Sequence, residues 1–371
     1  MNGKKLTALT FYLALAIAAT GMAVSPKGDF SRAEQRSLAS LPTLSSVWDG
    51  SSGEKLEDYL ADHFPLRTEW MSLRTRLQQL TGRKVVQDVY LLHDRLMERT
   101  DPISEESVKQ STAAVMEIAA RFSGATSLML IPSASEIHSD LLPDGISNVS
   151  QKIAIDRAYE QVSKSVNTLD CYSTLSANRE WHLYYRSDSH WTSLGAYLAY
   201  SASATQLGFT ATSLDRMNIE HASHHFLGNL YRRVMVQDFL PDSIDLYTLS
   251  GERQNHTVQI FDGRSWKNHD GVYFREYLQS ENASEVFLGP REPAIDITTM
   301  PGDRTLLIIG DEWAHTLIPF LIPHYSRITL IDPEAGPLPA EISADNYSQL
   351  LFCYPVEDFG QVDFTTLDGL F

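Results

Sequence analysis

The sequence predicts an α/β fold in which a parallel sheet is flanked by helices, and three observations support this prediction. Short, nearly continuous apolar runs at 127–131, 305–309 and 328–331 are typical of strands that are buried on both faces. Helical patterns at 105–122 and 313–325 alternate with these runs. Polar residues gather where the runs end, and in such sheets ligands bind at the carboxyl ends of the strands.

Other segments carry patterns for further elements. We expect a small hairpin over 85–97, and an irregular, polar stretch over 208–283. Weak strand signals lie at 244–249 and 258–261 within that stretch, and a buried strand is expected at 285–288. Additional helices are expected at 53–63, 68–81, 150–166 and 191–207.

The helix expected over 68–81 carries an apolar stripe. Trp70, Leu73, Leu77 and Leu80 recur at helical spacing and share one face. We interpret this stripe as packing against the main domain rather than as a partner site.

The N-terminus has the pattern of a signal peptide or signal anchor. Lys4 and Lys5 precede an apolar run from Leu6 to Val24. The length of this run is close to that of a helix that spans a bilayer, about 20 residues. Because short lysine-bearing N-termini stay inside, the rest of the chain is expected outside the cytoplasm, membrane-anchored or secreted. A buried N-terminal helix is disfavoured, since the segment has no polar face.

The chain divides into three expected parts. Residues 1–24 are the signal peptide or anchor, and residues 25–84 are a leader with short helices. Residues 85–371 form the main domain.

The chain is acidic, with a formal net charge of −17. An acidic surface repels nucleic acid and anionic lipid headgroups, so we expect neither as a partner. Hydrophobic residues make up 43% of the sequence, which favours a folded domain over disorder.

Cysteine and histidine spacing indicates no metal site, and we expect no cofactor. Cys171 and Cys353 do not form a CxxC motif; a disulfide is open to them in an oxidising compartment, but two buried free thiols are favoured. His221, His224 and His225 have a spacing that could bind a metal on a helix. Their segment has no clear helical pattern, so we interpret them as exposed loop histidines.

Two segments concentrate side chains that could carry chemistry. Asp188 and His190 are two residues apart at the start of an expected helix, where the carboxylate could hold the imidazole in one tautomer or simply cap the helix. The turn at 310–312 exposes Asp311 or Glu312 at the edge of the sheet, where nucleophiles stand in related turns. The alternative there is an acidic helix N-terminus, stabilised by about 0.3–1 kcal/mol through the helix dipole.

A third segment projects an arginine. The residues from Val286 to Pro293 are interpreted as a strand followed by a turn that carries Arg291. A solvated arginine is the alternative.

Several blocks of this sequence together resemble the DHHW family of surface proteins, which is related to SGNH hydrolases and alginate O-acetyltransferases. The resemblance covers nearly the whole chain, in the family's order, and implies an SGNH-like fold with Asp188 and His190 in the catalytic positions. The blocks are Phe30–Leu38, Asp62–Arg67, Tyr185–Trp191 with Gly195–Tyr197, Phe226–Tyr231, Phe287–Pro293, Gly310–Ala314 and Pro319–Leu321.

The sequence departs from the family at three positions. Glu312 falls on the position of the nucleophilic serine, Arg291 on that of an asparagine expected to stabilise an oxyanion, and Ser189 on that of the middle histidine. A carboxylate has no hydroxyl for His190 to deprotonate, so the acyl-serine route is absent. Glu312 and Arg291 are expected to pair instead.

These departures predict a non-catalytic cell-envelope protein that binds or organises surface glycan. The expected oxyanion or substrate-binding residues are Trp191, Gly228, Asn229, Arg291 and Asp311. The alternative is an O-acetyl transferase or esterase acting on envelope polysaccharide, with Ser133 or Ser135 as a substitute nucleophile. A glycosidase is disfavoured, because the adjacent carboxylates of Asp311 and Glu312 cannot flank a bond at the required separation of about 5–9 Å.

Overall fold

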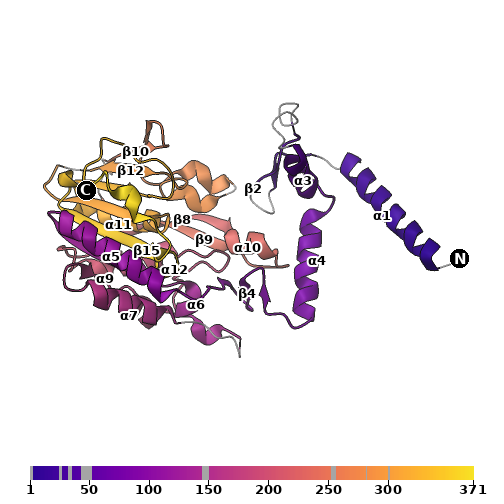
Figure 1. Cartoon of the computed structure of the whole chain (residues 1–371), viewed down its shortest axis with the longest axis horizontal. Helices are drawn as coiled ribbons and strands as arrows, with labels where there is room; N and C mark the ends of the chain where they lie inside the picture. The colour runs from indigo at the N-terminus through magenta and orange to yellow at the C-terminus, as the bar shows by residue number, and fades with distance from the viewer. Residues whose placement is uncertain are drawn as a thin grey trace.

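The computed structural model describes residues 3–24, 27–31, 36–42, 52–143, 150–251, 256–280, 282–299 and 301–371. An α/β main domain is built around one large sheet, and a mostly helical N-terminal part lies beside it (Figure 1). The predicted α/β class is therefore confirmed.

The central sheet of the described chain has eight strands in the order β11-β10-β12-β14-β13-β15-β6-β7. The strands are β6 (Ala125–Ile131), β7 (Asn167–Thr168), β10 (Thr257–Phe261), β11 (Trp266–His269), β12 (Ala294–Thr298), β13 (Thr305–Gly310), β14 (Arg327–Ile331) and β15 (Gln349–Pro355). The run from β14 to β7 is parallel, whereas β12, β10 and β11 are added antiparallel, so the sheet is mixed rather than wholly parallel. The carboxyl ends of the parallel strands lie along one edge.

Helices cover both faces of the sheet, because alternate residues of a strand point to opposite sides. Leu306 and Ile308 of β13 belong to the core that includes residues of α9 (Ser193–Ser203) and α11 (Trp313–Leu321). Leu307 and Ile309 belong to a second core with residues of α5 (Glu105–Arg121) and α7 (Gln151–Val162). Burial on both faces explains why these strands are nearly continuous apolar runs in the sequence.

The remaining elements of the main domain are short, apart from one hairpin. They are α6 (Ala134–Ile137), α8 (Tyr172–Ala177), α10 (Asn229–Val234), α12 (Val356–Phe359), the hairpin of β8 (Met217–Phe226) and β9 (Asp242–Leu249), and the 3-10 helices Ser139–Leu141, Leu214–Arg216, Arg275–Gln279, Ala283–Val286, Ile322–His324, Ala344–Asn346 and Phe364–Leu367.

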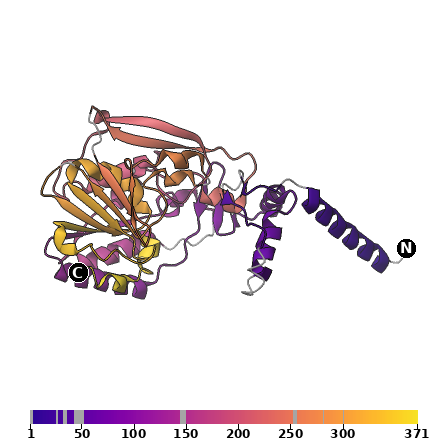
Figure 2. The same ribbon diagram turned by 90° about the horizontal axis from the view of Figure 1, so that it is seen from above.

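Two predictions for the middle of the chain are wrong. The stretch expected to be irregular contains the long β8–β9 hairpin, which lies along one side of the domain (Figure 2). The weak strand signals at 244–249 and 258–261 within it are confirmed as β9 and β10. The strand expected at 285–288 overlaps a 3-10 helix, and β12 follows it instead. Asp296 lies in the middle of β12 and binds Arg327, so the apolar run that would have revealed this strand is interrupted.

The N-terminal part has its own small elements. They are α1 (Gly3–Val24), the pair β1 (Phe30–Ser31) and β2 (Arg36–Ser37), α3 (Ser52–Asp62), α4 (Arg67–Leu80), and a sheet of β3 (Val85–Val86), β4 (Val89–Leu91) and β5 (Leu96–Glu98). Helix α1 extends away from the main domain (Figures 1 and 2). Among the described residues, no helix is long and apolar enough to cross a membrane. Within the leader predicted over residues 25–84, residues 25–26, 32–35 and 43–51 lie outside the described residues.

The apolar stripe of α4 is not buried, contrary to the prediction. Its four residues, from Trp70 to Leu80, are at least 43% exposed. The helix contacts α10 through a different side, where the buried hydroxyl of Thr75 donates a hydrogen bond to the carbonyl of Val234. A polar contact, rather than the stripe, therefore attaches α4 to the domain.

Candidate active site

A pocket of about 220 Å³ lies where the carboxyl end of β13 meets the loops before α9 and α10. Six of the residues predicted from the sequence line it: Asp188, His190, Trp191, Asn229, Arg291 and Glu312. Residues that are up to 124 positions apart in the sequence thus meet at one edge of the sheet, as expected for an α/β fold.

Asp188 orients the ring of His190. The Nδ1 atom of His190 lies 2.6 Å from Oδ1 of Asp188, and the backbone N–H of His190 donates to the same oxygen at 3.0 Å. A bridge between Tyr184 and Trp191 closes the loop that holds both residues. The N-cap of α9 is Thr192, so Asp188 serves the imidazole and does not cap the helix.

The loop before α10 supports Asp188 from behind. The backbone N–H of Asn229 donates to Oδ2 of Asp188 at 2.8 Å. Gly228 packs so closely that a Cβ atom on it would lie 2.3 Å from the Cβ of Asp188, which leaves room for glycine alone. The Asn229 side chain is bonded to Ser189, since its Nδ2 donates to the hydroxyl at 2.9 Å. Gly228 and Asn229 therefore position the Asp188–His190 pair.

Glu312 occupies the turn between β13 and α11 and faces His190. Its Oε1 lies 3.5 Å from Nε2 of His190, and its Oε2 lies 3.6 Å from Nε of Arg291. The hydrogen bond and charge of His190, with help from Arg291, lower the pKa of Glu312 against the opposing effect of burial. A charged carboxylate therefore faces the imidazole of His190 from this turn.

His190 is flanked by two carboxylates, and its pKa responds to both. Burial disfavours the charged ring, but the charges and hydrogen bonds of Asp188 and Glu312 outweigh that cost and raise the pKa of His190 to about 10. At neutral pH the ring is an imidazolium. An imidazolium has no free lone pair, so it cannot take a proton from a hydroxyl as a general base does.

Arg291 is held mainly by two residues that the sequence patterns did not single out. It makes two hydrogen bonds to Asp332, and its Nη2 also lies 3.1 Å from Oε2 of Glu334. The register of β12 with β14 pairs Ala294 with Ile331, which places the residues just before β12 beside those just after β14. The expected Glu312–Arg291 ion pair is present, but Asp332 is the closer partner. Asp332 could have been found in the sequence, because it directly follows the apolar run at 328–331.

Trp191 lines the pocket, whereas Asp311 and Gly228, also predicted for the site, are not among its lining residues. The Oδ1 of Asp311 accepts the backbone N–H of Trp313 at 2.9 Å, and burial raises the pKa of Asp311 to about 8. The indole N–H of Trp191 donates to the carbonyl of Trp313 at 3.2 Å. The Trp313 ring centroid lies 5.0 Å from that of His190. Asp311 and Trp191 thus position Trp313 beside the imidazole.

Several further polar residues line the pocket and were missed in the sequence, among them Arg232, Asn282 and Glu285. His315 is buried, its Nδ1 lies 3.1 Å from the carbonyl oxygen of Phe287, and burial lowers its pKa. Ser284 and Thr316 add hydroxyl groups to the lining. Within the described part of the chain, neither hydroxyl is hydrogen-bonded to His190. His315 could have been predicted as a site residue, because it follows Glu312 by three residues at the start of a helix.

Ser133 and Ser135 lie in a separate buried polar cluster beyond the end of β6. The hydroxyl of Ser133 accepts a hydrogen bond from Nε2 of Gln151 at 2.8 Å and lies 3.0 Å from the hydroxyl of Ser135. The free side of the His190 ring faces Glu312 rather than either serine.

The cysteines and the remaining predicted histidines lie outside the pocket. Cys171 and Cys353 are buried free thiols, which confirms the favoured interpretation. His221, His224 and His225 are exposed, as predicted, but they lie on strand β8 rather than in a loop. The Nδ1 atom of His221 lies 2.7 Å from Oδ1 of Asp245. Across the residues that the structure describes, no group of three or more side chains could hold a metal ion.

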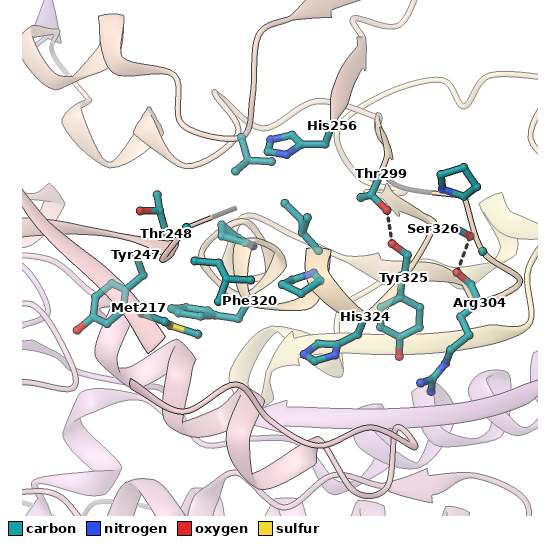
Figure 3. A pocket seen from close by; sticks show the side chains of 18 of the residues that line it. Met217, Tyr247, Thr248, His256, Thr299, Arg304, Phe320, His324, Tyr325 and Ser326 are labelled. Atoms are coloured by element: carbon teal, nitrogen blue, oxygen red, sulfur yellow. Dashed lines mark hydrogen bonds between the residues drawn. The ribbon is translucent and has the colours of Figure 1, made fainter. Parts of the chain in front are cut away.

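A larger cavity of about 790 Å³ lies at the opposite, amino end of β13 and β14 (Figure 3). Its lining is largely apolar, and two of its hydroxyls are used within the fold (Figure 3): Thr299 donates to the carbonyl of Tyr325, and Ser326 donates to that of Arg304. It lacks an oriented acid–base pair such as Asp188–His190 among its described lining residues. The smaller pocket is therefore the candidate active site.

The fold and the site together define an α/β protein that has an aspartate–histidine pair beside the turn that follows a parallel strand. The chain belongs to the DHHW protein family, whose model matches residues 81–331. The family resemblance found in the sequence blocks is thus confirmed. A comparison with curated protein sequences found no match.

Solved structures have the same fold at low sequence identity. A DHHW family protein from Eubacterium siraeum DSM 15702 is 19% identical, with a TM-score of 0.60, over 76% of this chain and 96% of that chain. PatB1 from Bacillus cereus, with a sulfonyl adduct, is 16% identical, with a TM-score of 0.62, over 74% of this chain and 96% of that chain. At this level of identity the similarity establishes the fold alone.

Proposed function

We propose that this chain is a cell-envelope protein of the SGNH-like class that has no serine-type acyl transfer and binds or organises surface glycan. The observation that carries this proposal is Glu312, which faces His190 at 3.5 Å where the reaction needs a hydroxyl. With His190 held as an imidazolium, the site lacks both a nucleophile and a free base.

The pocket lining suits a glycan. Asn229, Arg232, Asn282 and Glu285 surround it with amide, guanidinium and carboxylate groups, which can bond sugar hydroxyls.

We further propose that residues 1–24 act as signal peptide or membrane anchor and place residues 85–371 outside the cytoplasm. Lys4, Lys5 and the apolar run that follows support this location. Finding the full-length chain in the cytosol after cell fractionation would contradict it.

A second candidate is an O-acetyl transferase or esterase that acts on envelope polysaccharide with a rearranged nucleophile. It is favoured by the Asp188–His190 pair, which retains its 2.6 Å contact. It requires another hydroxyl, from Ser133, Ser135 or the pocket lining, to reach His190.

Hydrolysis of p-nitrophenyl acetate separates the two candidates. We expect no activity above background in the full chain, a gain in Glu312→Ser, and loss of that gain in Glu312→Ser/His190→Ala. If Glu312→Ser is inert, Arg291→Asn is combined with it to restore the oxyanion position. Parent activity that disappears in His190→Ala would overturn the non-catalytic proposal, and its disappearance in Ser133→Ala would identify the substitute nucleophile.

Glycan binding needs its own measurement. We expect the full chain to be retained on immobilised cell-wall polysaccharide, and Arg232→Ala, in the pocket, to weaken that retention. Arg121→Ala is the matched control, because Arg121 pairs with Asp368 on the surface of α5, away from the pocket lining. Equal retention of both variants would argue against this pocket as the glycan site.

A further inference from the structure

The outer face of helix α4 is apolar and exposed. Trp70, Leu73, Leu77 and Leu80 are 55%, 43%, 54% and 76% exposed, respectively. At about 3.6 residues per turn, the four side chains fall within a sector of about 80°. Scattered exposed apolar residues are common, but a narrow, continuous apolar stripe on one helix face is typical of a helix that binds an apolar environment such as the surface of a membrane.

The attachment of α4 to the domain points this stripe outward. Thr75, which lies outside the apolar sector, is buried and bonds to the carbonyl of Val234. Arg76 also faces the domain, where its Nη1 donates to Oε1 of Gln237 at 3.3 Å. The helix is therefore held through Thr75 and Arg76. The apolar sector stays exposed, and Leu73 at its least exposed point borders the groove between α4 and residues 235–238.

The segment around the stripe is basic, although the chain as a whole is acidic. Residues 66–84 contain five basic side chains and one acidic side chain, in a chain of net charge −17. Arg74, at the edge of the apolar sector, makes no ion pair with any residue that the structure describes, and the same holds for Arg83 and Lys84. Charge effects are screened beyond about 8 Å at physiological salt, so this local charge decides what the helix attracts.

Helix α4 also lies next to the end of α1. A Cβ atom at Gly21, near the end of α1, would lie 2.8 Å from Cγ of Pro65, in the corner between α3 and α4. The ammonium of Lys27 lies 5.4 Å from the centre of the Tyr59 ring in α3. The start of α4 is thus close to the end of α1, the segment expected to enter a membrane (Figure 1).

We propose that α4 lies on the surface of a bilayer that contains anionic lipids. Trp70 and the three leucines enter the boundary between headgroups and acyl chains, and Arg74, Arg83 and Lys84 contact lipid phosphates. The net charge of the whole chain is negative, which led us to expect that it avoids anionic headgroups. The net charge of residues 66–84, which face the membrane in this proposal, is positive.

A fluorophore placed on α4 tests this proposal. The native cysteines are buried, so an environment-sensitive NBD label reacts selectively with Leu73→Cys, in the stripe, or with Gln79→Cys, which is exposed on the opposite side of the helix. The labelled full chain is reconstituted in vesicles of phosphatidylcholine with phosphatidylglycerol, in vesicles of phosphatidylcholine alone, and in detergent.

We expect a blue shift and quenching by brominated lipid for the Leu73→Cys label in the mixed vesicles, and little change for Gln79→Cys. Replacing Arg74 and Arg83 with glutamine should weaken docking about fivefold for each charge, at about 1 kcal/mol per cation near an anionic surface. Equal emission from Leu73→Cys in vesicles and detergent would overturn the proposal. A shift that grows with protein concentration in detergent would assign the stripe to a second copy of the chain instead. An equal blue shift in vesicles with and without phosphatidylglycerol would overturn the assignment to anionic lipids. Flotation of the vesicles reports separately whether α1 anchors the chain.

Discussion

The Nε2 atom of His190 lies 3.5 Å from the Oε1 atom of Glu312, so a carboxylate faces the imidazole from the side where a hydroxyl would be activated. With Asp188 on the other side of the ring, and with Arg291 and Asp332 beyond Glu312, the site is a row of alternating charges. The ends of the row, Asp188 and Asp332, are buried, whereas Glu312 and Arg291 are about 40% exposed and partly screened by water. Such a row is suited to holding a pocket in shape.

The protonation of His190 is the first testable consequence. A ring-labelled NMR titration should place the His190 pKa at about 10, compared with 6.5 for an unperturbed ring. Because the folded-state pKa is raised, the stability that the charged ring contributes is fully present below about pH 6.5 and is lost as pH rises toward 10. Glu312→Gln should lower the pKa but leave it above the ordinary value, since Asp188 remains. Titration of His190 near pH 6.5 in the parent would contradict this account.

Gly228 tests the packing behind Asp188. Gly228→Ala should destabilise the fold by about 1–3 kcal/mol, because the added methyl group would overlap Asp188. Gly53→Ala in α3 is the matched control: no atom lies within 4 Å of its added methyl, and alanine favours a helix by about 0.5–1 kcal/mol. Urea unfolding measures both changes. Similar effects of the two substitutions would refute the close approach at Gly228.

Arg291 tests the outer half of the charge row. Arg291→Gln leaves the buried carboxylate of Asp332 without its cation and should cost about 1–3 kcal/mol, less than the about 3–5 kcal/mol of a fully buried pair, because Arg291 is 38% exposed. Arg275→Gln breaks an ion pair with Glu220 that is about half exposed, and should cost about 0–1 kcal/mol. Denaturant unfolding near neutral pH compares them. An Arg291→Gln variant as stable as the parent would show that Asp332 does not depend on Arg291.

The thiols of Cys171 and Cys353 should be inert in the folded protein. Both are buried, and burial raises the pKa of each thiol, so little thiolate forms at neutral pH. Ellman's reagent should find no reactive thiol in the native chain and two after unfolding. Detection of fewer than two thiols in the unfolded, unreduced chain would indicate a disulfide.

The signals that predicted the site are local in the sequence. Asp188 and His190 are two residues apart, and Glu312 directly follows a strand and a short turn, so a few neighbouring residues define their geometry. The partners of Arg291 were not predictable in this way. Asp332 comes beside Arg291 only because β12 runs antiparallel to β14, and β12 itself was hidden by the buried Asp296.

The sequence by itself determined the α/β class, the strands of the parallel core and the place of Glu312 in the turn after an apolar strand. These features depend on hydrophobic periodicity and on short spacings, which act between neighbours along the chain. Only the tertiary structure decided which carboxylate holds Arg291, that Gly228 and Asn229 support Asp188, and that the stripe of α4 is exposed. The physical reason is that an apolar stripe or a charge has no partner until strands and helices distant in sequence are packed together, and that packing is set by the whole chain.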